Sequence, residues 1–208
     1  VYSGTTAISG VPGAAAPIRL EFADIAGGTA GSLLPTGSAR DRVSGVDCTL
    51  IDNGMPVVVL RADAAGITGY ESCADLEANP ALRTFLEALH LEAGQLMGLG
   101  DVSEATVPKI CLVAPPRAGG VLSTRTFIPR RCHDAIGVLG AVSVATAALL
   151  PGSPSGEVMA PISGDSVILE HPTGLFEATI EISRRGGQVV VGVAQFGKLV
   201  LRHQPNSL

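Results

Sequence analysis

The stretch RRCHDAIGVLGAVSVATAALLPG, residues 130–152, decides the fold because it joins a cluster of reactive side chains to a segment without any charge. Residues 135–150 are all Ala, Ile, Gly, Val, Leu, Ser or Thr. A helix that is apolar on every side must be buried in a protein core or in a membrane. The free N–H groups and the dipole at its start favour carboxylate or phosphate ligands. The stretch therefore predicts a buried helix over about 134–150 that begins at an anion site.

The length of this apolar run separates a core helix from a membrane helix. Crossing a bilayer takes about 18 or more consecutive apolar residues, and Pro151-Gly152 stops the run after residue 150. The run is also rich in Ala and Gly and poor in Leu. We expect a core helix and no membrane insertion, with Gly137 and Gly140 allowing close approach of neighbouring backbone.

Composition and charge narrow the class of protein. The chain has 208 residues, of which 46% are hydrophobic and 16% charged, which is typical of a folded globular protein. Its net charge is -5 and its 14 basic residues are scattered, which argues against a nucleic-acid partner. The four cysteines have no paired zinc spacing, so we expect reduced thiols in a cytoplasmic protein. Because the chain opens with Val1 rather than Met, we expect a fragment or a processed product.

Strand signals outnumber helix signals along the rest of the chain. Strict alternation over 176–183, followed by the turn residues 184–187, predicts an antiparallel hairpin with one wet face. A second hairpin is expected around Asp52-Asn53-Gly54. Apolar residues at helical spacing predict an amphipathic helix over 80–96. Further strands are predicted at the apolar runs 57–60, 110–113, 189–193 and 199–201.

Seven short motifs, in a consistent order over nearly the whole chain, together resemble the PrpF family of isomerases. That family includes 2-methylaconitate cis-trans isomerases and 4-oxalomesaconate tautomerases, and residues 129–150 look closer to the tautomerases. The motifs are residues 10–18 (GVPGAAAPI), 33–37 (LLPTG), 51–56 (IDNGMP), 97–101 (MGLGD), 107–109 (VPK), Cys132-His133, and 171–174 (HPTG).

The resemblance implies an α+β fold, a diaminopimelate-epimerase-like lobe in which a mostly antiparallel, β-barrel-like sheet surrounds a central apolar helix. Such enzymes have two lobes that face each other across the active site. Residues 1–208 resemble only the C-terminal lobe, so the N-terminal lobe, with its Gly-Asn-Cys-Gly-type loop and the principal acid/base Lys and Cys, is absent from this chain. We therefore expect the partner to be that missing lobe or a second copy in a homo-oligomer.

The activity implied by the resemblance is isomerisation of an unsaturated di- or tricarboxylate without cofactor or metal, most like the 4-oxalomesaconate tautomerases of gallate breakdown. Such chemistry moves a proton next to carbonyl and carboxylate groups, so it needs a general acid and base. The alternatives are a 2-methylaconitate cis-trans isomerase, or a lobe that binds carboxylates without turning them over. This half alone is expected to be inactive.

Lys109 and Cys132 are the candidate catalytic residues. Lys109 starts a predicted strand, where its ammonium could bind a substrate carboxylate or act as acid or base; the alternative is a solvated lysine at a strand edge. Cys132 and His133 lie before or within the first turn of the predicted buried helix, where the dipole would lower a thiol pKa. Adjacent residues of a helix point about 100° apart, which argues against a Cys-His hydrolase.

His133, His171, Thr173 and Gly174 are the candidate substrate-binding residues. The 171–174 motif offers an imidazole, a hydroxyl and an accessible backbone N–H, although Pro and Gly also mark ordinary turns. Without an accompanying carboxylate or cysteine pattern the two histidines do not suggest zinc. We expect Lys109, His133 and the Thr173-Gly174 turn to converge on the start of the buried helix, where they would bind a carboxylate.

Overall fold

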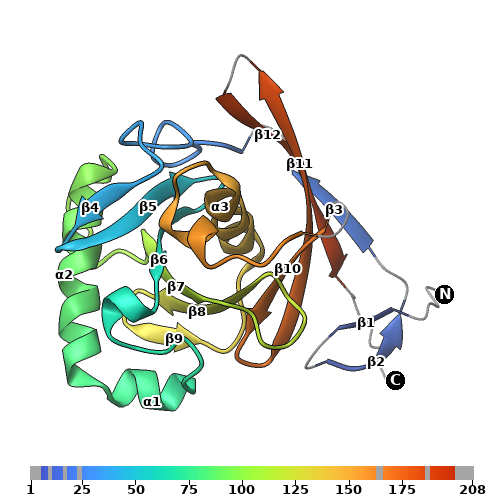
Figure 1. Ribbon diagram of the computed structural model, residues 1–208, viewed down its shortest axis with the longest axis horizontal. Helices are drawn as coiled ribbons and strands as arrows, with labels where there is room; N and C mark the ends of the chain where they lie inside the picture. Colours follow the sequence, from blue (N-terminus) through green and yellow to red (C-terminus); the bar gives the residue numbers. More distant parts are fainter. Residues whose placement is uncertain are drawn as a thin grey trace, which may run out of the picture.

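The computed structural model shows an α+β fold in which one large curved sheet surrounds a central helix (Figure 1). It describes the backbone of residues 6–8, 11–15, 18–22, 25–162, 166–185 and 188–199, and the side chains of 25–162 and 166–177. The helices are α1 (Cys73–Ala78), α2 (Pro80–Leu96) and α3 (Val138–Leu149), with short 3-10 helices η1 (Asp63–Ala65) and η2 (Pro154–Glu157).

Ten strands of the described chain form the large sheet, in the order β3-β12-β11-β10-β8-β7-β6-β5-β4, with β9 added on β8. Only β6–β7 and β8–β10 pair in parallel, so the sheet is mostly antiparallel, as predicted. The strands are β1 (Thr6–Ile8), β2 (Val11–Ala15), β3 (Ile18–Phe22), β4 (Asp41–Val43), β5 (Val46–Asp52), β6 (Pro56–Arg61), β7 (Lys109–Ala114), β8 (Leu122–Ile128), β9 (Arg131–His133), β10 (Ser166–His171), β11 (Gly174–Arg185) and β12 (Gln188–Leu199); β1 and β2 pair separately.

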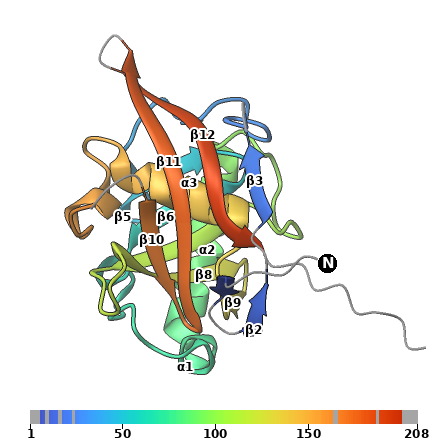
Figure 2. The same cartoon turned by 90° about the vertical axis from the view of Figure 1, so that its right-hand side faces the viewer.

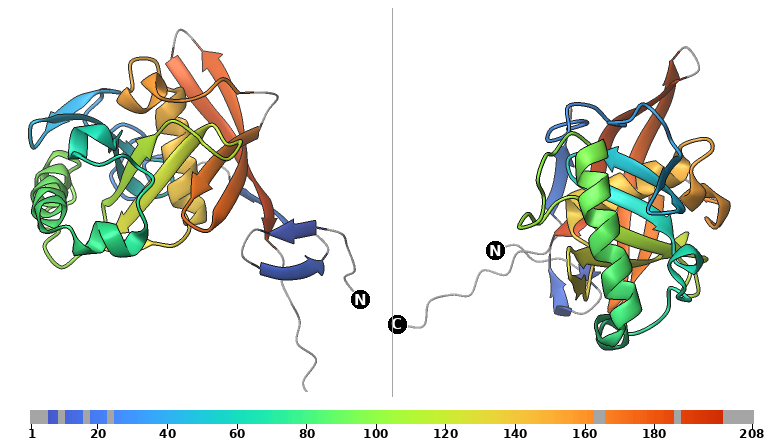
Figure 3. Two further views of the ribbon diagram at one scale, coloured as in Figure 1. Left: turned by 60° about the horizontal axis from the view of Figure 1, so that its bottom comes forward. Right: turned by 90° about the vertical axis from the view of Figure 1, so that its left-hand side faces the viewer.

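The central strands are apolar on both faces because each face meets a different helix layer. On β6, Val58 and Leu60 pack in one core with the buried side of α2, whereas Val57 and Val59 pack in a second core with α3. Figure 3 shows α2 lying across the outer face of the sheet, with α3 on the opposite side. Figure 2 shows β10, β11, β12 and β3 passing along the other side of α3. This double burial explains the continuous apolar runs in the sequence.

The central helix begins later than predicted. Residues 131–133 pair with β8 as strand β9, and α3 starts at Val138 with Gly137 as its N-cap. The prediction of a helix from about residue 134 is therefore wrong at this end, because the N–H of Ala135 bonds to the His133 ring and the backbone at Gly137 is extended. The core placement of the helix is confirmed, since residues 140–148 are buried. A Cβ built on Gly140 meets nothing within 4 Å among the described residues.

The predicted hairpins and the amphipathic helix are confirmed. β5 and β6 pair around Gly54, whose φ of 83° favours glycine, and β11 pairs with β12. Gly186 and Gly187 of the second predicted turn, and residues 200–201 of the last predicted strand, lie outside the described residues. Helix α2 spans the predicted residues, while the short α1 before it was not predicted.

None of the helices in the described part of the chain combines the length and the apolar composition that a bilayer span requires.

Candidate functional site

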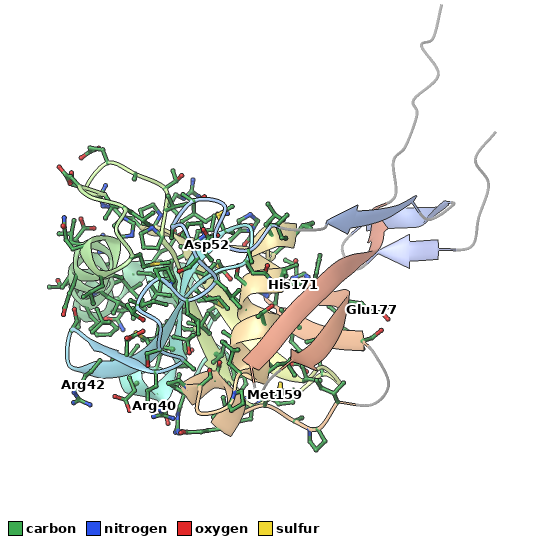
Figure 4. The ribbon with its side chains drawn as sticks, turned by 90° about the horizontal axis from the view of Figure 1, so that it is seen from above. Arg40, Arg42, Asp52, Met159, His171 and Glu177 are labelled. Atoms are coloured by element: carbon green, nitrogen blue, oxygen red, sulfur yellow. The ribbon has the colours of Figure 1, made fainter. Side chains whose placement is uncertain are left out.

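A split in the sheet lies beside the start of α3. One edge of β8 pairs with β7. Along its other edge, β10 pairs with residues 122–123 and β9 pairs with residues 126–128, which leaves Thr124 and Arg125 between the two partner strands. The last residue of β9 is His133 and the last residue of β10 is His171, so both imidazoles lie at this split. Figure 4 shows His171 where β10 and β11 approach α3.

The carbonyl oxygen of Asp134 joins the two strand ends. Thr173 donates to it twice, from its backbone N–H at 3.2 Å and from its hydroxyl at 2.8 Å. The turn between β10 and β11 is thereby fixed to the segment that leads from β9 into α3. Four of the six predicted site residues, His133, His171, Thr173 and Gly174, belong to these two connected segments.

The proton of the neutral His133 ring is placed by a local hydrogen bond. The backbone N–H of Ala135 donates to His133 Nδ1 at 3.0 Å, so Nδ1 is an acceptor and the proton of the neutral ring is on Nε2.

Thr126 lies opposite His133 in the strand register and contacts Cys111 Sγ, which packs in the core around α3. His133 is therefore on the α3 side of the sheet.

The second imidazole, that of His171, is held by Thr173. The Thr173 hydroxyl has one proton, which it donates to Asp134, so at 3.2 Å it accepts a hydrogen bond from His171 Nδ1. Burial is the main cause that lowers the pKa of His171, with His133 and Arg125 adding repulsion, while the carbonyls of Asp134 and Leu175 oppose the shift. The environment thus favours a neutral His171 with its proton on Nδ1 and an unprotonated Nε2.

Lys109 lies at the same helix start. It is the first residue of β7, and by strand alternation it shares the α3 side of the sheet with Cys111. Its Nζ lies 3.9 Å from the position that a Cβ on Gly137 would occupy, next to the N-cap of α3. Burial lowers the pKa of Lys109. No carboxylate within the described ranges forms an ion pair with it, so its ammonium is available to an external anion.

Cys132 lies on the other face of the sheet. It packs in the outer core, and its backbone N–H donates to Glu77 of α1 at 3.0 Å. The expectation that the helix dipole lowers its thiol pKa is wrong. Burial raises the pKa of Cys132, a hydrogen bond with the Cys73 thiol adds to the rise, and α3 begins six residues after it. The structure therefore brings Lys109 and His133 to the α3 side and leaves Cys132 behind the sheet.

Two buried side chains near the split were not predicted as site residues. Arg125 projects from the middle of β8, and Glu170 precedes His171 on β10. The available signal was an arginine inside the strand segment STRTF, but nothing in that pattern says which segment covers it.

Among the residues with described side chains, no three His, Cys, Asp or Glu residues gather in a group that could hold a metal ion.

Comparison with known proteins gives consistent matches. The family model for PrpF proteins matches residues 1–195. The 4-oxalomesaconate tautomerase of Pseudomonas putida KT2440 is 54% identical over 190 residues, and the (4E)-oxalomesaconate Delta-isomerase of Novosphingobium sp. KA1 is also 54% identical over 190 residues. Each match covers 90% of this chain but only 52% and 53% of these relatives, respectively, so the chain spans about half their length.

A solved structure matches the fold. The crystal structure of a methylitaconate-delta-isomerase superposes with a TM-score of 0.82 and 23% sequence identity, covering 95% of this chain and 58% of that chain. The predicted α+β lobe with a central helix is therefore confirmed.

Proposed function

Because this chain belongs to the PrpF family, we propose that it is the C-terminal half of a cofactor-independent isomerase that acts on an unsaturated polycarboxylate, with 4-oxalomesaconate as the first candidate. The substrate candidate comes from the two relatives that are 54% identical. One observation supports the chemistry in this chain: Lys109, His133 and His171 lie near the start of α3. The two imidazoles have opposite tautomers, so Nε2 is a donor in His133 and an acceptor in His171. The free thiols are consistent with our expectation of a cytoplasmic protein.

The reaction requires a proton to leave one carbon and another to be added at a conjugated position. The intermediate carries enolate-like charge that hydrogen-bond donors stabilise. In this proposal the Lys109 ammonium binds a substrate carboxylate near the free N–H groups of α3, and it can act as acid or base. His133 donates from Nε2 to developing negative charge, whereas neutral His171 offers Nε2 as an acceptor. Thr173 positions His171 and is not itself required to exchange a proton.

We propose no chemical step for Cys132 in this half. Its thiol is buried behind the sheet against α1, on the face opposite to Lys109. A buried thiol with a raised pKa is a poor nucleophile and a poor base at neutral pH. The principal acid and base that the family resemblance implies belong to the other half, so this half supplies carboxylate binding and charge stabilisation.

The test compares the complete protein with the 208-residue chain. Both are assayed by ultraviolet absorbance for conversion of 4-oxalomesaconate, with 2-methylaconitate as the alternative substrate. We expect conversion by the complete protein and little or none by the chain alone. Rapid turnover by the 208-residue chain would refute the assignment of the principal acid and base to the other half. A complete protein that binds polycarboxylates but converts neither substrate would favour the binding-module alternative.

A further inference from the structure

Arg125 is a buried cation without a counterion in the described part of the chain. Only 8% of the surface of Arg125 is exposed to solvent. The guanidinium donates from Nε to the Glu71 carbonyl at 2.8 Å and from Nη1 to the Thr124 carbonyl at 2.9 Å. Carbonyls accept hydrogen bonds but do not neutralise charge, and buried charges are normally paired. Two of the five N–H groups are used by these bonds, so three remain for another acceptor.

Arg125 lines a cavity of about 350 Å³ at the split in the sheet. Other polar walls are provided by Ser123, His171 and Thr173. Arg117 adds a second positive charge at the rim, where it stacks 3.3 Å from the centre of the Tyr70 ring. The cavity is therefore a small, cationic space that is continuous with the histidine and threonine of the candidate site.

Two of the nearby carboxylates are occupied by backbone groups, and a third, that of Asp134, interacts with the Cys73 thiol. Glu170 also lines the cavity, but its oxygens accept from the N–H groups of Arg117, Ala118 and Gly120 at 2.5–3.0 Å. Glu71 accepts from the N–H groups of residues 68–70. Neither forms an ion pair with Arg125 in the described structure. The positive charge of Arg125 is thus left for a ligand.

We infer that Arg125 anchors one carboxylate of a di- or tricarboxylate ligand in this cavity, as a subsite separate from Lys109. The geometry of guanidinium favours a planar carboxylate, which it can grip with two parallel hydrogen bonds. Arg125 pairs with Leu112 of the outer core, so it lies on the outer face of the sheet, whereas Lys109 lies on the α3 side. A carboxylate bound by Arg125 would lie beside His171 and Thr173, which line the same cavity. That the ligand is the reacting substrate rests on the proposed function; that the subsite binds a carboxylate does not.

The test uses tricarballylate, a saturated tricarboxylate that cannot isomerise, and the complete protein. Calorimetric titration is carried out on wild type, Arg125→Gln, Arg125→Lys and, as a control, Arg83→Gln, whose arginine is exposed on α2. We expect Arg125→Gln to weaken the binding of tricarballylate by about tenfold or more. The affinity of Arg125→Lys should lie between those of Arg125→Gln and wild type, and the affinity of Arg83→Gln should equal that of wild type. An affinity of Arg125→Gln equal to that of wild type would overturn the inference.

A measurement on the unmodified side chain covers the case in which substitution disturbs the fold, since Arg125 also holds the Glu71 carbonyl. In the wild-type protein, the Nε–H resonance of Arg125 should shift on titration with tricarballylate while that of Arg83 stays still. An unmoved Arg125 resonance at saturation, or a wild-type protein that does not bind tricarballylate, would overturn the subsite.

The two proposals fail in distinguishable ways. Arg125-dependent binding of tricarballylate without conversion of 4-oxalomesaconate would refute the proposed function and support the subsite. Conversion with tricarballylate affinity indifferent to Arg125 would refute the subsite alone.

Discussion

The hydroxyl of Thr173 donates to the carbonyl oxygen of Asp134 across 2.8 Å, and this bond links the end of β10 to the segment that starts α3. The same hydroxyl accepts from His171, so one side chain sets both the position of the turn and the tautomer of the imidazole. The orientation of His171 therefore depends on a contact that joins residues 39 apart in the chain.

Removing this hydroxyl should lower activity more than stability. Thr173→Ala deletes one neutral hydrogen bond to each partner, and each such bond contributes about 0.5–1.5 kcal/mol. We expect kcat/KM of the complete enzyme to fall roughly tenfold, with Thr173→Ser restoring most of it because the hydroxyl returns. Steady-state kinetics with thermal unfolding of each variant check this. Equal loss in the Ala and Ser variants would contradict the hydrogen-bonding role.

Lys109→Ala should remove a charge-assisted contact to substrate. The expected loss is about 1.5–3 kcal/mol, or roughly ten- to a hundredfold in kcat/KM. Exposed Arg83→Ala is the matched control and should have no effect. Only protonated Lys109 binds a carboxylate, and burial lowers its pKa from the ordinary 10.5. The alkaline fall in kcat/KM should therefore begin at lower pH than for an exposed lysine, and should disappear from the pH profile of Lys109→Ala.

The half-buried His171 should make the protein less stable in acid. Its pKa in the folded protein is lowered from 6.5, so below that pH the unfolded chain binds the proton more readily than the folded one. The stability associated with this group is complete above pH 6.5 and is lost as pH falls through the folded pKa. Denaturant unfolding from pH 7.5 to 5 should show a smaller loss of unfolding free energy for His171→Gln than for wild type. An identical pH dependence in both would contradict this.

Two helical glycines should respond in opposite directions to alanine. A Cβ on Gly94 of α2 would clash with Val102 Cγ2, so Gly94→Ala should destabilise the protein by about 1–3 kcal/mol through overpacking. A Cβ on Gly140 of α3 meets nothing within 4 Å among the described residues, so Gly140→Ala should stabilise it by about 0.5–1 kcal/mol through helix propensity. Denaturant unfolding of both variants measures the difference. The reverse order would contradict the packing described.

Local patterns predicted the elements whose structure is determined locally. The alternation over 176–183, the turn at Gly54 and the helical spacing of α2 each depend on residues close in sequence. The start of α3 was misplaced because contacts with other segments hold the residues before it: Thr173 binds the carbonyl of Asp134, and pairing with β8 keeps residues 131–133 extended. That same pairing turns Cys132 to the outer face, which is why the expected effect of the dipole on its thiol fails.

The candidate site was predictable by residue type but not by arrangement. His133, His171, Thr173 and Lys109 belong to motifs that the sequence displays, yet the split between β9 and β10 arises from the strand order. Arg125 was missed because its burial depends on the segment around Glu71, 54 residues earlier, and no spacing in the sequence encodes that contact.

The central claim, that this chain is half of a proton-transferring isomerase of a polycarboxylate, is tested most directly in deuterium oxide. The complete protein is mixed with 4-oxalomesaconate and followed by proton nuclear magnetic resonance. We predict conversion with solvent deuterium incorporated at carbon, and conversion at least tenfold slower for Lys109→Ala. Unchanged substrate in the presence of folded complete protein, or conversion unaffected by Lys109→Ala, would contradict the account.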